Sequence, residues 1–275
     1  MQKIRNIVWP LIAALFIGLL TISFFPFLQG VETSNPGLSQ QTIVAAYIAF
    51  AFGFFIPFSF LKIPATLIHE AGHALSSSLL GGKVKYIKVE IDESGLTWSE
   101  TKHGRFGAFL VCASGPLANS VFFIFTANLI VHNRSQYWIG FTLLAIILIT
   151  ISTVRSFWGW MTAIFISIIL IQSLIKSIQV SSSTDTFSNI GIWTQSSINL
   201  AIIFTAYTAA IELHYAWRMR NVRSRTQDEY RVSKALGISP KIGGWLLFFT
   251  NLLFVLFAFS LALGWENLLS PGKLL

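Results

Sequence analysis

The chain has 275 residues, of which 54% are hydrophobic and only 11% are charged, and its formal net charge at pH 7 is +8. Long apolar runs recur along it, so this composition excludes an ordinary soluble domain and predicts an all-α polytopic membrane protein. The basic residues cluster beside the apolar runs, which indicates positive-inside topology and contact with anionic lipid, not binding of nucleic acid.

Residues 1–41 are predicted to form an N-terminal anchor helix and an outer loop. Lys3 and Arg5 precede an apolar run from Ile7 to about Leu28. This run is too long for a signal peptide, and no small-residue cleavage site follows it. The turn-rich segment GVETSNPGLSQQ then forms the loop. The basic N-terminus is expected on the cytoplasmic side.

Residues 42–265 are predicted to form one membrane-embedded core, followed by a short tail at 266–275. A second apolar helix covers about 42–61, and the helix that carries the motif HEAGH covers about 65–80. Further apolar spans lie at about 106–131, 137–153, 157–175, 190–211 and 245–265. In total we expect about six full transmembrane helices, a partly inserted HEAGH helix and a small β hairpin.

The hairpin is predicted from the segments KVKYIKVEI, DESG and LTWSE, which follow the HEAGH helix. They are typical of two short strands that are joined by a tight turn. The alternation of side chains changes phase between Tyr86 and Ile87, which predicts a β-bulge there.

The positions of basic residues predict the topology. Segment 219–241 holds most of the excess of Lys and Arg and is therefore expected in the cytoplasm. Counting spans backwards from it places Arg155 and the hairpin on the same side. This count agrees with a cytoplasmic N-terminus only if the HEAGH helix remains a half-span near the cytoplasmic face. We expect an integral protein of the bacterial cytoplasmic membrane.

HEAGH predicts a metal site. Residues four apart share one face of an α-helix, so His69 and His73 can both reach a zinc ion. Glu70 lies beside them and can act as general base toward a water molecule that the metal holds. Each charged group at the membrane centre costs about 2.5–3.5 kcal/mol, which favours a function for these side chains over chance packing.

Catalytic zinc usually has a third protein ligand, and the sequence leaves its identity open. The single cysteine, Cys112, lies in an apolar run and is interpreted as a core residue. On the predicted cytoplasmic side, Glu212 ends an apolar span and Asp228 begins the amphipathic stretch QDEYRVSKALG, while His214 is a further possibility. Glu212 can instead pair with nearby arginines, and Asp228 can simply stabilise a helix N-terminus.

The succession of HEAGH, GG-K-V, SGLT and ASGPLAN resembles the site-2 protease superfamily of intramembrane zinc metalloproteases, and in particular its smaller branch without a PDZ domain. The resemblance covers about residues 62–255. It implies that His69 and His73 bind Zn²⁺ and that Glu70 is the general base. In GPLAN, Asn119 is expected to hydrogen-bond across to the HEAGH helix, whereas Gly115 is interpreted as a helix-packing residue.

The segment TQDEYRVSKALGISPKIGGWLLFF resembles the Asp-containing element of that branch. This resemblance favours Asp228 over Glu212 as the third metal ligand. Gln227 and Glu229 stand where the common motif has Ser and Ala, and the Leu-Asp-Gly motif of the better-known site-2 proteases is absent.

The leading hypothesis is therefore a zinc-dependent intramembrane endopeptidase that hydrolyses peptide bonds in or near transmembrane segments of other membrane proteins. Its expected partners are a transmembrane protein substrate and the lipid bilayer. A β element beside the zinc can pair with a substrate segment that is unwound into a strand. The alternative is a catalytically inactive membrane protein that keeps the zinc site for a structural or regulatory use.

Overall fold

The computed structural model describes residues 7–8, 11–12, 40–56, 59–90, 94–100, 104–131, 135–181, 187–219 and 227–263. Within these ranges the chain forms eight helices and one antiparallel hairpin, which confirms the predicted helical class. The elements are α2 (Gln40–Phe55), α3 (Ser59–Leu79), β1 (Lys83–Val89), β2 (Gly95–Glu100), α4 (Gly104–Val131), α5 (Ser135–Thr153), α6 (Phe157–Ser181), α7 (Phe187–Met219), α8 (Asp228–Leu236) and α9 (Pro240–Leu263).

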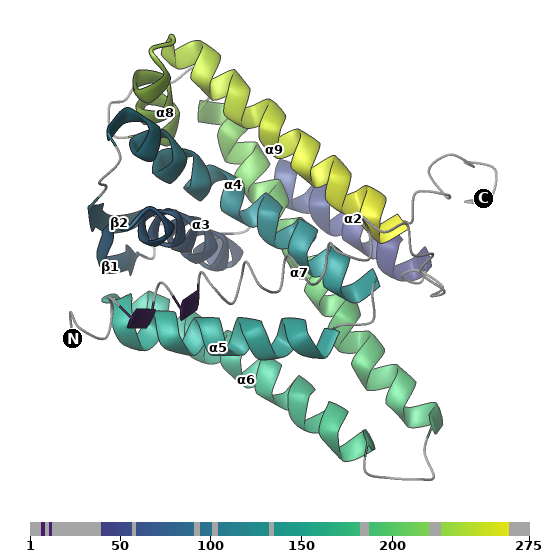
Figure 1. The fold of residues 1–275 in the computed structure, drawn as a ribbon. Helices are drawn as coiled ribbons and strands as arrows, with labels where there is room; N and C mark the ends of the chain where they lie inside the picture. The colour runs from purple at the N-terminus through teal and green to yellow at the C-terminus, as the bar shows by residue number, and fades with distance from the viewer. Residues whose placement is uncertain are drawn as a thin grey trace, which may run out of the picture.

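Helix α4 is the centre of the bundle and packs against α3, α7, α8 and α9, while α2 lies along α7 (Figure 1). An apolar core joins α2, α4, α7 and α9 away from the hairpin, and its largest fully buried side chains include Phe123, Phe125, Ile202 and Val255. Helices α5 and α6 form a separate pair, which contacts α7 and β1. The bundle therefore has a continuous apolar core at one end of α4.

The hairpin has one covered and one open edge. Strands β1 and β2 pair antiparallel, and the register shifts between Val84 and Tyr86, so the predicted bulge is present slightly earlier in β1 than expected. On its other edge β1 is covered, because Ile87 forms a parallel bridge with Val154 and accepts a hydrogen bond from the Arg155 N–H at 3.0 Å. Within the described residues, the outer edge of β2 pairs with no strand.

Two predicted boundaries near the motif helix were wrong. The second helix ends at Phe55 and not near residue 61, and the HEAGH helix begins at Ser59 and not near Ala65. The sequence accounts for this, because Pro57 disfavours helix in the residue before it. Pro64 lies inside α3, near its beginning, where its nitrogen cannot donate the hydrogen bond of a regular helix.

Helix α7 is longer than the predicted span at 190–211. It continues to Met219, so the polar residues of ELHYAWRM belong to a helix and not to a loop. Leu213 and Ala216 remain buried, which shows that packing continues past the apolar run. Glu212 is consequently a buried residue in the interior of a helix and not a residue at the end of a span.

Two described helical stretches, Gly104–Asn128 and Pro240–Ala262, are long and apolar enough to cross a membrane. Shorter apolar stretches lie in α2, α5 and α6 at Gln41–Phe55, Gly140–Thr153 and Phe157–Ile168. The expectation of about six full spans is thus supported only in part. Most of the predicted anchor at 7–28 and the tail at 266–275 lie outside the described residues.

The elements that the sequence predicts to be cytoplasmic lie at one end of the bundle. In Figure 1 the hairpin, α8 and the connection between α5 and α6 are all on the left, around the beginning of α4. Helix α3 packs between this hairpin and α4. The HEAGH motif is therefore close to that end.

Candidate metal centre

Close packing of α3 on α4 positions the HEAGH motif. A Cβ atom on Gly72 would lie 2.5 Å from the carbonyl oxygen of Ser114 and 2.7 Å from Cβ of Ala118, so only glycine permits this approach. At the other end of the motif helix, Gly81 has φ +68°, a backbone conformation that favours glycine and ends α3. The imidazoles of α3 thus lie directly against the backbone of α4.

The structure brings three of the residues singled out in the sequence together. Nε2 of His69 and Nε2 of His73 are each 3.1 Å from Oδ2 of Asp228, and the two nitrogens are 3.2 Å apart. These atoms form the group of His, Cys, Asp and Glu side chains that can hold a metal ion in the described part of the chain.

The opposite nitrogen of each imidazole determines which atoms face one another. Nδ1 of His69 lies 3.1 and 3.2 Å from the two carboxylate oxygens of Glu212, and Nδ1 of His73 lies 2.6 Å from the carbonyl oxygen of Val111. Because these oxygens only accept hydrogen bonds, both Nδ1 atoms carry the proton. In the neutral rings, both Nε2 atoms then present lone pairs to the Asp228 oxygen.

Three electron-pair donors that converge without a hydrogen between them fit a cation. Two neutral imidazoles and a carboxylate match the preference of zinc for nitrogen and oxygen ligands. Ligand atoms about 2.0–2.1 Å from a tetrahedral zinc ion are about 3.3 Å from one another, close to the separations of His69, His73 and Asp228. The two histidines also have the outer hydrogen-bond partners that metal-bound imidazoles usually have.

Gly115 of α4 keeps the space beside the imidazoles open. A Cβ atom at this position would lie 2.2 Å from Nε2 of His73 and 2.8 Å from Nε2 of His69. Gly115 was interpreted as a residue that permits close packing on the HEAGH helix, and its contact with two side chains of that helix agrees with this interpretation. Its spacing from Asn119 places both residues on one face of α4, and this shared face was the signal in the sequence.

Helix α8 delivers Asp228 from its first turn. Gly237 ends this helix with φ 72°, and α8 packs against α4 and α9. Burial raises the pKa of the Asp228 carboxyl, but in the absence of a metal the charges and hydrogen bonds of protonated His73 and His69 would outweigh burial and lower it. A cation between neutral imidazoles would act in the same direction, so the carboxyl group is ionised there, as a metal ligand must be.

Glu212 and His214, the other ligand candidates, lie elsewhere. Glu212 is behind His69, on the Nδ1 side, and takes no part in the convergence of Nε2 and Oδ2 atoms. It also accepts a hydrogen bond of 3.0 Å from Nδ2 of Asn119. His214 packs against the rings of Phe54 and Tyr215.

Strand β2 lies against Glu70, and the residues of SGLT make this contact. A Cβ atom on Gly95 would meet Oε1 of Glu70 at 2.4 Å, and the Thr97 hydroxyl donates a hydrogen bond of 2.8 Å to the Glu70 carbonyl oxygen. Glu70 itself is buried. The beginning of β2 is thereby placed beside the carboxylate that the sequence predicts to be the general base.

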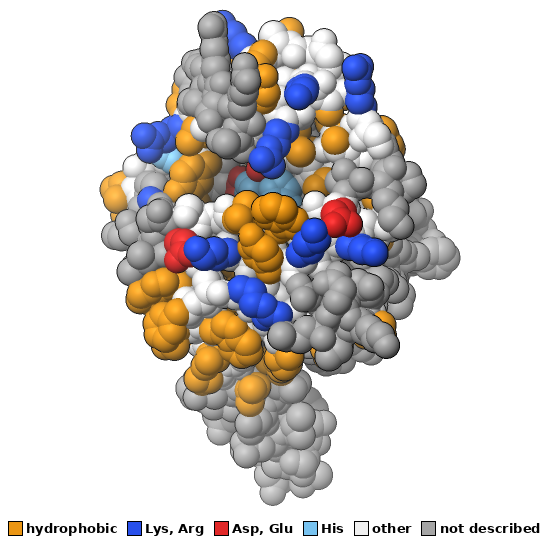
Figure 2. Space-filling view, turned by 90° about the vertical axis from the view of Figure 1, so that its left-hand side faces the viewer, with side chains coloured by type: hydrophobic (Ala, Val, Ile, Leu, Met, Phe, Trp, Pro, Cys, Tyr) orange, Lys and Arg blue, Asp and Glu red, His pale blue; other side chains and the backbone are white. Residues whose placement is uncertain are grey.

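The centre is open on the hairpin side. The side chains of His69, His73 and Asp228 keep 20%, 11% and 17% of their surface exposed. Figure 2 shows histidine and acidic side chains at the bottom of a hollow, with hydrophobic, Lys and Arg side chains around it. Solvent can therefore reach the site from this face.

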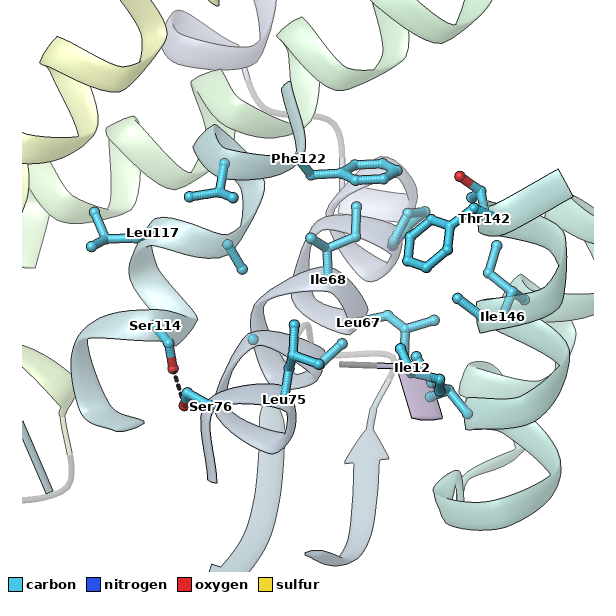
Figure 3. Close-up of a pocket in the computed structure, with 18 of the residues that line it drawn as sticks. Ile12, Leu67, Ile68, Leu75, Ser76, Ser114, Leu117, Phe122, Thr142 and Ile146 are labelled. Carbon is cyan, nitrogen blue, oxygen red and sulfur yellow. Dashed lines mark hydrogen bonds between the residues drawn. The ribbon is translucent and has the colours of Figure 1, made fainter. Parts of the chain in front are cut away.

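A second feature of α3 is an apolar cavity on another of its faces. The cavity has a volume of about 890 Å³ and is lined by α3, α4, α5, α6 and α7 together with Ile12 (Figure 3). The Ser76 and Ser114 hydroxyls, 2.6 Å apart, join α3 to α4 at its border. The buried hydroxyls of Thr142 and Thr150 line it and have no hydrogen-bond partner in the described structure.

Comparison with known proteins gives the family. The model of the family described as Peptidase M50B-like matches residues 41–258. Comparisons with curated proteins and with solved structures found no match. The matched range contains the three convergent residues, Glu70 and the hairpin. The chain therefore belongs to the Peptidase M50B-like, site-2 protease-like family, as the sequence resemblance indicated.

Proposed function

We propose that the protein is a zinc-dependent intramembrane endopeptidase that cleaves peptide bonds in or near transmembrane segments of other membrane proteins. The observation that carries this proposal is the convergence of three lone-pair donors from His69, His73 and Asp228 beside Glu70. Membership of a family of metallopeptidases supports it, since M50 peptidases are zinc-dependent.

In this proposal Nε2 of His69, Nε2 of His73 and Oδ2 of Asp228 hold the metal. Zinc bound there would polarise the scissile carbonyl as a Lewis acid and lower the pKa of water. Three protein ligands leave a position for water or substrate, as catalytic zinc sites require. Gly115 keeps that neighbourhood free of a side chain.

Glu70 is the proposed general base and acid. Its carboxylate would accept a proton from the water that attacks the peptide carbonyl carbon, and would deliver it to the nitrogen of the leaving amine as the C–N bond breaks. Its position against Gly95 supports this role, because β2 approaches the carboxylate with no side chain in between. The hydrogen bond from Thr97 to the Glu70 backbone keeps strand and base in register.

The open edge of β2 is the proposed binding place for the substrate backbone. A helical peptide bond is hidden by its own hydrogen bonds, so cleavage requires an unwound segment, and such a segment can add to a sheet edge. The edge of β1 is closed by Val154 and Arg155, which leaves β2 for this pairing in the described sheet. A strand added there would pass beside Glu70.

The cavity beside α3 is the proposed place for the apolar part of the substrate. Its lining along α4 extends from Phe109 to Phe122, about 20 Å of helix. Its nearly continuous apolar surface fits a transmembrane helix, and such a helix can offer polar groups to Thr142 and Thr150, which acyl chains lack. Ile12, a helical residue of the chain's own N-terminal segment, already lies at its border.

The test is a cleavage assay in cells with a panel of single-span membrane proteins that are tagged at both ends. We expect wild type to cleave one or more of them and the Glu70→Gln variant to cleave none, because an amide cannot accept the proton. Glu90→Gln is the matched control, since Glu90 lies at the end of β1 and pairs with Lys88 at the surface.

Equal fragment patterns for wild type and Glu70→Gln would contradict the proposal. Zinc bound at the site together with that result would favour the alternative, an inactive membrane protein that keeps the metal for structure or regulation.

A further inference from the structure

We infer that Glu212 and Asn119 are positioning residues for the metal, acting through His69. They form a chain of hydrogen bonds across three helices, from Asn119 on α4 to Glu212 on α7 and then to His69 on α3. The inference rests on the metal-binding part of the proposed function and is independent of proteolysis. It assigns a role to a buried carboxylate that binds no metal itself.

The buried carboxylate of Glu212 requires interactions that offset the free-energy cost of its burial. Glu212 is 6% exposed, on a helix whose neighbouring residues are apolar and buried. An ionised group in such surroundings is costly unless hydrogen bonds satisfy it. Glu212 has two donors, Nδ1–H of His69 and Nδ2–H of Asn119. Its position is therefore determined by the two contacts that compensate its burial.

The orientation of Asn119 follows from its partners. Its Nδ2 atom is 3.0 Å from the Ala65 carbonyl oxygen and 3.0 Å from Oε2 of Glu212. Both partners only accept hydrogen bonds, so the amide nitrogen must face them and both of its hydrogens are used. Asn119 thus holds the α3 backbone and the Glu212 side chain at the same time.

The consequence for His69 is a fixed tautomer and a fixed ring. A proton on Nδ1, held by Glu212, leaves the lone pair on Nε2, the atom that faces Asp228 and His73. A carboxylate in this position also makes the imidazole a stronger ligand. The corresponding acceptor at His73 is the carbonyl oxygen of Val111, which accepts the Nδ1–H but carries no charge and therefore strengthens the ligand less than Glu212 does. Metal affinity should accordingly depend on α7, although α7 supplies no ligand.

The experiment measures zinc affinity of the purified full chain in detergent, by competition with a chelator, for Glu212→Gln, Asn119→Ala and the double variant. We expect Glu212→Gln to lower the affinity about 10-fold or more and Asn119→Ala to lower it less. The loss of affinity in the double variant should be smaller than the product of the two single losses, because Asn119 acts in part through Glu212.

Asn251→Ala is the matched control for Asn119→Ala. Asn251 is fully buried and accepts a hydrogen bond of 2.7 Å from the Ser120 hydroxyl, but it does not contact the metal ligands. The Asn251→Ala substitution should destabilise the chain and leave zinc affinity unchanged. The absorption spectrum of the Co²⁺-loaded chain gives a second readout, which should change for Glu212→Gln and remain as in wild type for Asn251→Ala.

Unchanged zinc affinity and an unchanged Co²⁺ spectrum in Glu212→Gln would overturn the inference, as would equal losses of affinity in Asn119→Ala and Asn251→Ala. Failure of the wild-type chain to bind zinc would instead overturn the proposed function. The two failures are thus distinguishable.

Discussion

The two halves of α4 are held by different interactions. The half nearer the hairpin meets α3 and α7 through small and polar residues, with Gly115 against the imidazoles and Asn119 between the two helices, while an apolar cluster around Ala113 joins it to α8 and α9. The distal half is held by the packing of large apolar side chains, and Phe123 and Phe125 are fully buried among α2, α7 and α9. One half of α4 therefore positions the metal-site residues, and the other half stabilises the fold. Substitutions in the first half should change metal binding, and substitutions in the second half should change the free energy of unfolding.

Gly115→Ala should have the largest effect, and it should affect the site alone. The new methyl group would overlap the position of Nε2 of His73, so a ligand must move, and zinc affinity should fall about 100-fold or more. Alanine favours helix over glycine, so the fold should persist. Chelator competition and thermal unfolding measure the two quantities. Gly140→Ala on α5, which meets open space, is the control.

Phe123→Ala should show the reverse pattern. Removing this buried ring leaves a cavity and should lower the free energy of unfolding by about 3 kcal/mol, while zinc affinity of the folded chain should remain as in wild type. Unfolding in detergent measures the loss. Phe249→Ala, at a half-exposed position on α9, should cost far less. A strong loss of metal binding in folded Phe123→Ala would break the comparison.

Gly95→Ala extends the comparison to the hairpin. A methyl group here would press against the Glu70 carboxylate and leave the metal ligands untouched. We expect kcat for a cleaved substrate to fall about 10-fold, a modest part of what general-base catalysis contributes, with zinc affinity unchanged. A decrease in zinc affinity that matched the decrease in kcat would show that the hairpin and the metal centre are not separable.

Thr150→Val should have the smallest effect. It replaces an unpartnered buried hydroxyl of the cavity with a methyl group, so the chain should be as stable as wild type or slightly more stable. If a substrate helix hydrogen-bonds there, kcat/KM should fall about 5-fold, the value of one hydrogen bond. Thr250→Val, at a position whose hydroxyl bonds to its own helix on α9, is the control. Equal kinetics for both variants would exclude substrate contact at Thr150.

Local patterns were sufficient to predict much of this molecule. The four-residue spacing of His69 and His73 predicts a shared helix face, and β-branched alternation predicts the hairpin with its bulge. These features depend on neighbours in the sequence. The end of α7 was missed for the same reason, because polar composition suggested a loop where long-range packing of Leu213 and Ala216 continues the helix.

Local sequence patterns could not predict which acidic residue binds the metal and which one hydrogen-bonds to a metal ligand. Glu212 and Asp228 are both carboxylates near the same end of the bundle, and they contact opposite nitrogens of one imidazole. Only the packing of α7 and α8 on α3 and α4 separates the two. The contact of Gly115 with the histidines also depends on the distance between two helix backbones, which the sequence does not specify.

The route from the first metal ligand to the last has a consequence for biosynthesis. His69 and Asp228 are 159 positions apart, and four described helices, α4 to α7, are made between them. A ribosome that has delivered α3, the hairpin and α4 to the membrane has produced two imidazoles and a base but no third donor. An unfinished chain of this kind lacks the complete donor set, so the hydrolytic centre proposed here would come into being only after α8 has been made and has packed against α4.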